Sequence, residues 1–306
     1  MNQEQYRKLA HELNHPGDID KVARDYGIER ELALIIYTQR ITRDATSRFY
    51  VVKNQIARIA SLYDKGTSLV ELARRHGFPP VLLGYLLFLH KGMPRKQFWQ
   101  DVRCPEHIRD ARLRKEISAA VADDMIYSPR GEEIQRERGH RGERWLFEWL
   151  DRRNIKYMTE HDLKKLKDYT KTPDALFMKP MVVAGKKTAW IESKANFGDV
   201  VEIKRNLKKQ LLPYVKLFGP GIVVYWYGYV SDIEPPEGVT LVDANFFREP
   251  HPAHGHHAER KENPTGAEVA HEPRAHHPPP HHPPAPQHAE PTLPDPPLPK
   301  EDYIGE

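Results

Sequence analysis

The spacing of apolar residues changes once along the chain, from a purely helical period to an alternation of helix and strand. Residues 1–125 show helical spacing, whereas residues 136–247 mix helices with short apolar runs typical of strands. In the second region we expect a helix at 142–155, strands near Tyr157 and at 173–178 and 188–195, a helix at 201–217 and a buried strand at 221–230. The order αβββαβ predicts an α+β multidomain chain, in which an all-α region precedes an α/β core with a mixed sheet and helices on its faces.

The remaining residues, 250–306, are rich in Pro and His and contain almost no large apolar side chain. Such a composition cannot bury enough apolar surface to offset the loss of chain entropy, so we expect a disordered tail. Ten of the 17 histidines lie there and could bind transition metals adventitiously.

Charge is distributed unevenly between these regions. Beyond residue 250 there are four Lys/Arg against nine Asp/Glu, so the first 250 residues carry a net charge of +9, although the whole chain has +4. A basic folded part favours polyanionic partners, and nucleic acid is the obvious one.

Neither a membrane span nor a secretory signal is expected. No apolar run approaches the roughly 20 residues that cross a bilayer, and the N-terminus looks like the start of a helix. Cys104 is the single cysteine, which excludes an intrachain disulfide and a multi-thiolate zinc site. We therefore expect a cytoplasmic protein, free or associated with the nucleoid.

The helical region contains an approximate repeat, at 18–40 and 67–89. In each copy a short amphipathic helix reaches a turn at Gly27 or Gly77 and an apolar helix follows, as in a helix-turn-helix. Basic residues cluster around these units, and among them Arg74 and Arg75 are candidates to contact phosphates. Packing hairpins with solvated basic faces remain the alternative.

Acidic residues and a lysine on two neighbouring strands predict a metal site. Side chains alternate along a strand, so Glu192 and Lys194 share a face, and Asp174 begins the strand before the predicted hairpin. Mg²⁺ or Mn²⁺ prefers oxygen ligands, which Asp174, Glu192 and the carbonyl of Ser193 would supply. A surface aspartate and a chance E-x-K are the alternative, but a charge inside the apolar run around residue 191 would be costly without a partner.

Lys194 would lie beside the water that attacks a phosphodiester. It would orient that water and screen charge developing on the phosphate, and we prefer this electrostatic role to that of a free base because carboxylates surround it.

These residues resemble a known family. T-P-D at 172–174, E-S-K at 192–194 and the order of the elements are similar to the restriction-endonuclease-like PD-(D/E)XK superfamily. KTPDALF at 171–177 with the doubled helical units resembles, more narrowly, the TPD-motif proteins of archaea and eukaryotes, which include codanin-interacting nucleases; we expect an archaeal type of member.

The resemblance implies three supporting residues. Glu143 matches the helix glutamate that helps to hold the metal, with Glu148 as a rival. Gln210 and Tyr214 match a Q-x-x-x-Y element beside the site, although Pro213 between them departs from an ideal helix; simple packing is the alternative.

Two further groups of charged residues flank the predicted site in the sequence. Glu160 and Asp162 could extend the acidic cluster or be ordinary loop charges. Basic segments on either side could bind phosphates through four lysines: Lys171, Lys204, Lys208 and Lys209.

The sequence thus predicts a metal-dependent nuclease acting on DNA, and the resemblance suggests branched or structured DNA as substrate. A non-catalytic DNA-binding regulator or scaffold and an RNA-processing nuclease are the alternatives. A homodimer and a protein partner stay open, as do the choice between endo- and exonucleolytic cleavage and the metal used in the cell.

Overall fold

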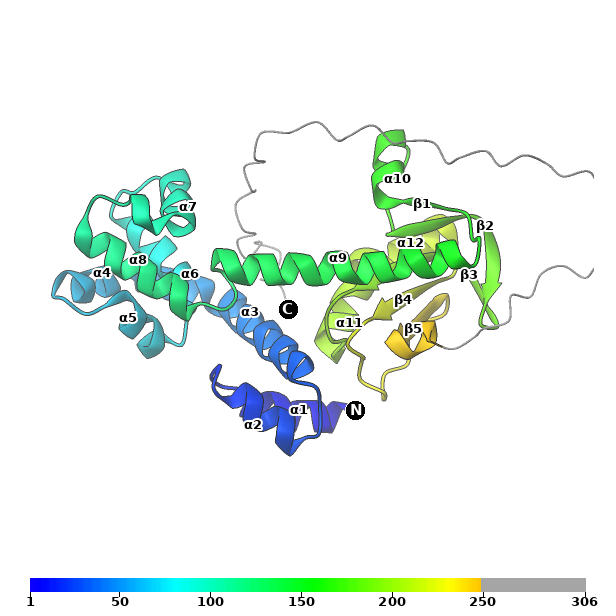
Figure 1. Ribbon diagram of the computed structural model, residues 1–306, viewed down its shortest axis with the longest axis horizontal. Helices are drawn as coiled ribbons and strands as arrows, with labels where there is room; N and C mark the ends of the chain where they lie inside the picture. The colour runs from blue at the N-terminus through cyan, green and yellow to red at the C-terminus, as the bar shows by residue number, and fades with distance from the viewer. Residues whose placement is uncertain (249–306) are drawn as a thin grey trace, which may run out of the picture. The chain divides into compact units, whose positions relative to one another are not determined.

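The computed structural model describes residues 1–248 (Figure 1). The tail predicted at 250–306 lies outside the described residues. None of the helices in the described part combines the length and apolar character needed to cross a membrane.

The N-terminal region is all-helical, as predicted. Its elements are α1 (Gln3–Glu12), α2 (Asp18–Asp25), α3 (Arg30–Asn54), α4 (Ile56–Asp64), α5 (Leu69–His76), α6 (Pro80–His90), α7 (Arg95–Arg103), the 3-10 turn η1 (Pro105–His107) and α8 (Ala111–Asp123). The two predicted repeats are the helix pairs α2–α3 and α5–α6. Gly77 ends α5 in the left-handed region, at φ 52°, and Pro80 opens α6, so each glycine-turn-helix unit follows from its local sequence.

The two helix pairs belong to different hydrophobic cores. Helices α4 to α8, with the end of α3, build their own core around Leu83, Leu87 and Trp99. The first pair instead shares a core with the sheet, where Tyr6 stacks on Phe197 at 5.5 Å between ring centroids. The first 37 residues are therefore part of the structure that supports the second region.

A five-stranded mixed sheet forms the second region, in the order β1-β2-β3-β4-β5. Its strands are β1 (Tyr157–Thr159), β2 (Ala175–Val183), β3 (Lys186–Lys194), β4 (Gly221–Tyr225) and β5 (Val239–Asp243). The first three strands pair antiparallel, and β3, β4 and β5 run parallel. This confirms the predicted fold class of an all-α region followed by an α/β core.

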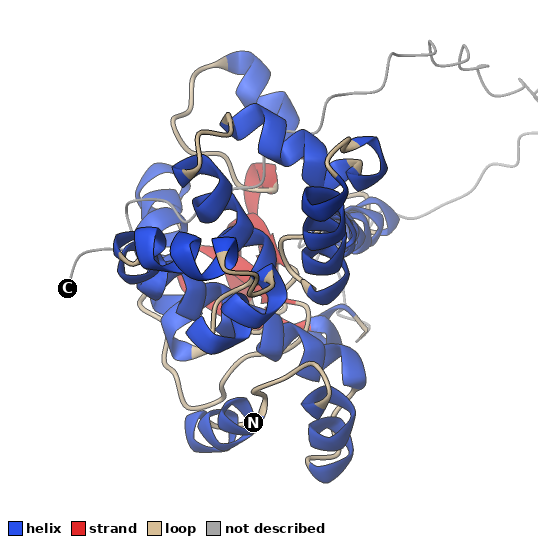
Figure 2. Cartoon of the chain, turned by 90° about the vertical axis from the view of Figure 1, so that its left-hand side faces the viewer, coloured by secondary structure: helices blue, strands red, loops and turns tan. Residues whose placement is uncertain are grey.

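Helices pack on both faces of this sheet. Figure 2 shows the strands behind the helices when the chain is viewed from the side of the N-terminal region. Helix α9 (Pro129–Arg152) packs Leu146 and Leu150 on one face. The opposite face carries α11 (Val200–Asn206), a π-helical turn (Leu207–Leu211) and α12 (Leu212–Phe218). Two short elements complete this region: α10 (Glu160–Leu166) follows β1, and the 3-10 turn η3 (Ala244–Phe247) follows β5.

Several boundaries differ from the prediction. Helix α9 starts at Pro129 rather than at residue 142, because Ser128 caps it and Pro129 suits its first turn, although the added segment has no apolar stripe. Strand β4 ends at Tyr225, and β5 was not predicted at all. The helix expected at 201–217 is real but contains the π-helical turn.

Candidate active site

The register between β2 and β3 brings the predicted acidic residues together. Ala175 pairs with Ile191 in this antiparallel ladder, so continuing it by one residue places Asp174 opposite Glu192. The two segments are joined here by side chains: the Ser193 N–H donates to Asp174 Oδ2 at 2.7 Å, and the Asp174 N–H donates to Glu192 Oε2 at 3.3 Å. The TPD segment is thereby fixed against the end of β3.

Lys194 completes this group from the same strand. Its Nζ donates to Glu192 Oε1 at 2.7 Å and to Gln210 Oε1 at 2.6 Å. The side chains of Lys194 and Glu192 are 16% and 5% exposed, so their ion pair is largely shielded from water. The period-2 argument, which put both side chains on one face of the sheet, agrees with this geometry.

Gln210 and Tyr214 approach the group from the helical layer. Gln210 belongs to the π-helical turn, and Tyr214 belongs to α12, where its ring packs on Trp190 at 5.2 Å between centroids. The Tyr214 hydroxyl donates to the Thr172 carbonyl at 3.0 Å. The pair therefore touches both the lysine and the TPD loop.

Ser193 has its side chain on the opposite face of the sheet. Its Oγ accepts from Trp226 Nε1 at 2.8 Å, beneath Gly142 of α9. A Cβ at position 142 would lie 2.6 Å from Trp226 Nε1, so only glycine allows α9 to come this close. This contact positions α9, and with it Glu143, at the end of β3.

The carboxylates of this group repel one another. Burial and then the charge of Glu192 raise the pKa of Asp174, against the opposing effects of the Ser193 N–H and Lys194. Burial also raises the pKa of Glu143, and the nearby carboxylates of Glu160 and Glu192 add to this effect. A bound cation would offset the repulsion and lower the pKa of both carboxyl groups.

The donor set fits a hard divalent cation. The side chains of Asp174 and Glu192 offer only oxygen atoms as ligands. Their two carboxylates lie close together and the single charge of Lys194 does not neutralise both, which favours a positive ion between them. Glu143 is near enough to be affected by Glu192, but within the described residues the carboxylates of 143, 174 and 192 do not all meet within 4.8 Å. Metal ligation by these residues and by the Ser193 carbonyl stays a prediction.

The other acidic candidates have visible structural partners. Glu148 pairs with Arg152 at 3.1 Å on an exposed part of α9. Asp162 caps α10 through Thr159. Glu160 accepts a weak hydrogen bond from the Thr172 hydroxyl at 3.4 Å, and so touches the TPD loop.

The predicted phosphate-binding residues lie on the surface. The side chains of Arg74 and Arg75 are exposed, and each pairs with an acidic residue, Asp123 and Glu71 respectively. The four lysines are also exposed: Lys171, Lys204, Lys208 and Lys209. Arg43, from the basic cluster of the helical region, instead pairs with buried Asp199 at 2.7 Å.

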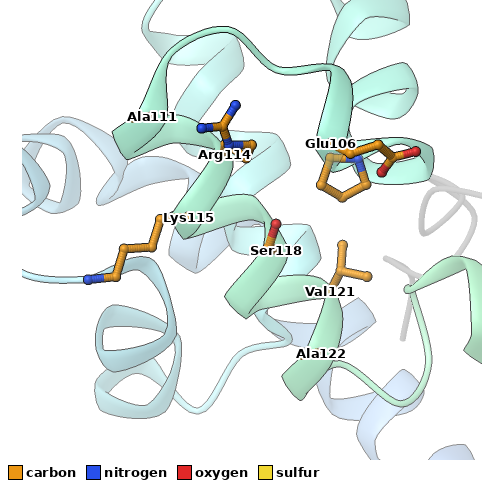
Figure 3. A pocket seen from close by; sticks show the side chains of 8 residues that line it. Glu106, Ala111, Arg114, Lys115, Ser118, Val121 and Ala122 are labelled. Carbon is orange, nitrogen blue, oxygen red and sulfur yellow. The ribbon is translucent and has the colours of Figure 1, made fainter.

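The helical region contains two further features, a surface pocket and a group of potential metal ligands. A surface pocket beside α8 is lined by Glu106, Arg114 and Lys115 among others (Figure 3). Nearby, Cys104, Glu106 and His107 are, within residues 1–248, a set whose ligand atoms all lie within 4.8 Å. Neither feature includes a residue of the predicted active site.

Known proteins with similar sequences indicate the family of this chain. A family model described as a protein of unknown function with a TPD sequence motif matches residues 109–245. CDAN1-interacting nuclease 1 of Xenopus laevis is 34% identical over 212 residues, which are 66% of this chain and 68% of that protein. This chain belongs to the TPD-motif family of these nucleases. The resemblance stated from the T-P-D residues is thus confirmed at the level of the family.

Other relatives of the same name match over similar stretches. The Danio rerio protein is 35% identical over 184 residues, covering 57% of this chain and 61% of its own length. The Homo sapiens protein is 32% identical over 206 residues, covering 63% and 70%. No solved structure matches the chain.

Proposed function

We propose that this chain is a divalent-metal-dependent nuclease of the PD-(D/E)XK type that hydrolyses phosphodiester bonds in DNA. The observation that carries the proposal is the group of Asp174, Glu192 and Lys194, held together by hydrogen bonds at adjoining ends of β2 and β3. Membership in a family whose members are named nucleases supports the same activity.

Each residue has a role that follows from its contacts. Asp174 and Glu192 would hold Mg²⁺ or Mn²⁺, with Glu143 and the Ser193 carbonyl as further oxygen donors. The cation, when bound, supplies Lewis-acid activation of the phosphodiester and of the attacking water. Lys194 presents a positive charge to the oxygens that become more negative during cleavage.

Gln210 and Tyr214 act on the site without touching the reacting atoms in this proposal. Gln210 and Glu192 both accept from the Lys194 ammonium group and so fix its direction. Tyr214 holds the Thr172 carbonyl, which keeps the TPD loop against β3. Both are positioning residues, and their loss would misalign the lysine or the aspartate.

The exposed basic residues would bind the phosphate backbone. Arg74 and Arg75 belong to the second helix pair, and the four lysines named above lie beside the TPD loop and on α11 and the π-helical turn. Branched or structured DNA remains the substrate that we propose. A homodimer and a protein partner are further proposals; the relatives are named for an interaction with CDAN1.

The test is a cleavage assay with the purified full chain. Labelled duplex, forked, four-way and single-stranded DNA and matching RNA are incubated with Mg²⁺, Mn²⁺ or EDTA. Asp174→Ala and Lys194→Ala should each abolish metal-dependent cutting, while Lys186→Ala, an exposed lysine at the other end of β3, should leave it intact.

Two outcomes would redirect the proposal. Metal-dependent cutting confined to RNA would make the chain an RNA-processing nuclease with the same site. Binding of DNA without cutting of any substrate would instead favour the non-catalytic regulator or scaffold.

A further inference from the structure

A second polar pocket begins where β3 ends. Ala195 and Asn196 follow Lys194 directly and line a cavity of about 230 Å³ together with residues of α3, α9 and α11. Three arginines from these three helices line it: Arg43, Arg138 and Arg205. The cavity therefore adjoins the proposed active site along the chain but uses none of its residues.

Arg138 is the least satisfied of these arginines. It is only 8% exposed, yet its Nε has no hydrogen-bond partner, and its ion pair with Glu31 is long, at 3.6 Å. Glu31 also pairs with Arg141 and accepts from the Tyr227 hydroxyl at 2.8 Å. One carboxylate thus serves two arginines, and the Arg138 guanidinium, which otherwise lies 5.9 Å from the centre of the Tyr227 ring, keeps surplus positive charge in a largely buried position. Such a charge costs free energy unless an anion binds.

The other two arginines are already paired. Arg43 donates to Asp199 at 2.7 Å, and Asp199 also accepts from the Tyr6 hydroxyl at 2.8 Å. Arg205 pairs with Glu202. These pairs fix the walls of the cavity, so the surplus charge of the lining comes from Arg138.

A second polar atom in the wall also lacks a partner. The Oδ1 atom of Asn196 is buried and accepts no hydrogen bond, although its Nδ2 donates to Glu202 at 2.9 Å. Buried polar atoms without partners are rare in folded proteins. Arg138 and Asn196 both line the cavity, and the largely buried positive charge of Arg138 makes an anionic group the ligand that it favours.

We propose that this cavity binds the terminal phosphate of the nucleic-acid strand that is cleaved at the proposed active site. The inference rests on the proposed nuclease function and deepens it, because it makes the protein a reader of strand ends. A backbone phosphate carries a nucleotide on each side and would need both in the cavity to reach buried Arg138. A terminal phosphate enters with a nucleotide on one side only.

The test measures binding without cleavage. Fluorescence anisotropy in EDTA compares the full chain on otherwise identical forked DNA ending in a 5′-phosphate, a 3′-phosphate or hydroxyls. We expect one phosphorylated end to bind about 10- to 100-fold more tightly than the hydroxyl end, as for a charge-assisted contact. Equal affinity for all three ends would overturn the inference.

Variants distinguish binding in this pocket from general electrostatic attraction between the protein and DNA. Arg138→Met should abolish the preference for the phosphorylated end, whereas Arg152→Met, an exposed arginine of the same helix, should retain it. Thr42→Phe fills the cavity without removing an arginine and should abolish the preference too. A preference that survives Thr42→Phe in a variant with normal thermal melting would contradict the proposal.

Failure of this inference differs from failure of the nuclease proposal. Because the assay contains EDTA, a chain that cuts no substrate can still show the end preference. A chain that cuts DNA but binds all ends equally would retain the nuclease function and lose the end-reading pocket.

Discussion

Removal of the Lys194 ammonium group should destabilise the metal-free protein strongly. In Lys194→Met the carboxylate of Glu192, whose side chain is 5% exposed, loses the donor 2.7 Å away. Breaking a buried ion pair from one side costs about 3–5 kcal/mol, because the remaining charge stays desolvated. Urea unfolding in EDTA at neutral pH should show a loss of this size, and excess Mg²⁺ should reduce it if the cation binds Glu192.

An exposed ion pair of nearly the same length provides the control. Lys164 and Glu160 lie 2.8 Å apart, but their side chains are 61% and 47% exposed. Lys164→Met should cost only about 0.3–0.5 kcal/mol, as is typical of i,i+4 pairs on helix surfaces. The reasoning is refuted if the two methionine variants lose similar stability, or if Lys194→Met costs less than about 1 kcal/mol.

Three further predictions follow from the same site. The raised pKa of Asp174 means that the folded, metal-free chain retains a proton that the unfolded chain has lost, so its stability should fall as pH rises from the ordinary aspartate pKa to the raised one. Asp174→Asn should flatten this profile in urea titrations with EDTA; an unchanged slope contradicts the shift. Excess Mg²⁺ or Mn²⁺ should stabilise the wild type by mass action, by about 2.7 kcal/mol at 100 times Kd, and so raise its melting temperature, but not that of Asp174→Ala. In Gly142→Ala the new Cβ would lie 2.6 Å from Trp226 Nε1, so the variant should lose about 1–3 kcal/mol of stability in urea unfolding and have lower activity. Gly139→Ala on the same helix places its Cβ in open space and should not destabilise the protein. Equal effects of the two alanines would show that helix propensity, not the close approach of Trp226, decides.

Local patterns were sufficient to predict most of the elements. The helix pairs follow from apolar spacing and from the glycine at each turn, and the strands of the hairpin follow from their apolar runs. The first half of α9 could not be found this way, because its buried residues are Gly131 and Arg138 rather than an apolar stripe. Strand β5 was missed because its five residues, VTLVD, include two polar side chains, whereas the equally short β4 lies in a continuous apolar run.

The candidate site was predictable to the extent that it depends on two strands. The period of two places Glu192 and Lys194 on one face whatever the rest of the fold does. The register that sets Asp174 opposite Glu192 depends on the hairpin, and no local rule specified it. The arginine-lined pocket was beyond prediction, since Arg43 and Arg138 meet only through the packing of distant helices.

Pro213 shows how a departure from regular structure contributes to the site. A proline cannot donate to the carbonyl four residues earlier and its ring clashes with that turn, so a regular helix through residues 207–218 is disfavoured. The chain instead makes a π-helical turn, in which the Leu212 N–H donates to the Leu207 carbonyl, and α12 begins around the proline. Such turns are common at functional sites because they alter the direction of the side chains that they carry.

The π-helical turn gives different neighbours to the two residues on either side of this proline. Four residues apart on a regular helix, Gln210 and Tyr214 would stack on one face and compete for the same neighbours. With the π-helical turn, Gln210 accepts from Lys194 at 2.6 Å while Tyr214 packs on Trp190 and holds the Thr172 carbonyl. Pro213 made a regular helix doubtful from the sequence, and it thus accounts for the π-helical turn. Through this turn one segment supports both the lysine and the TPD loop.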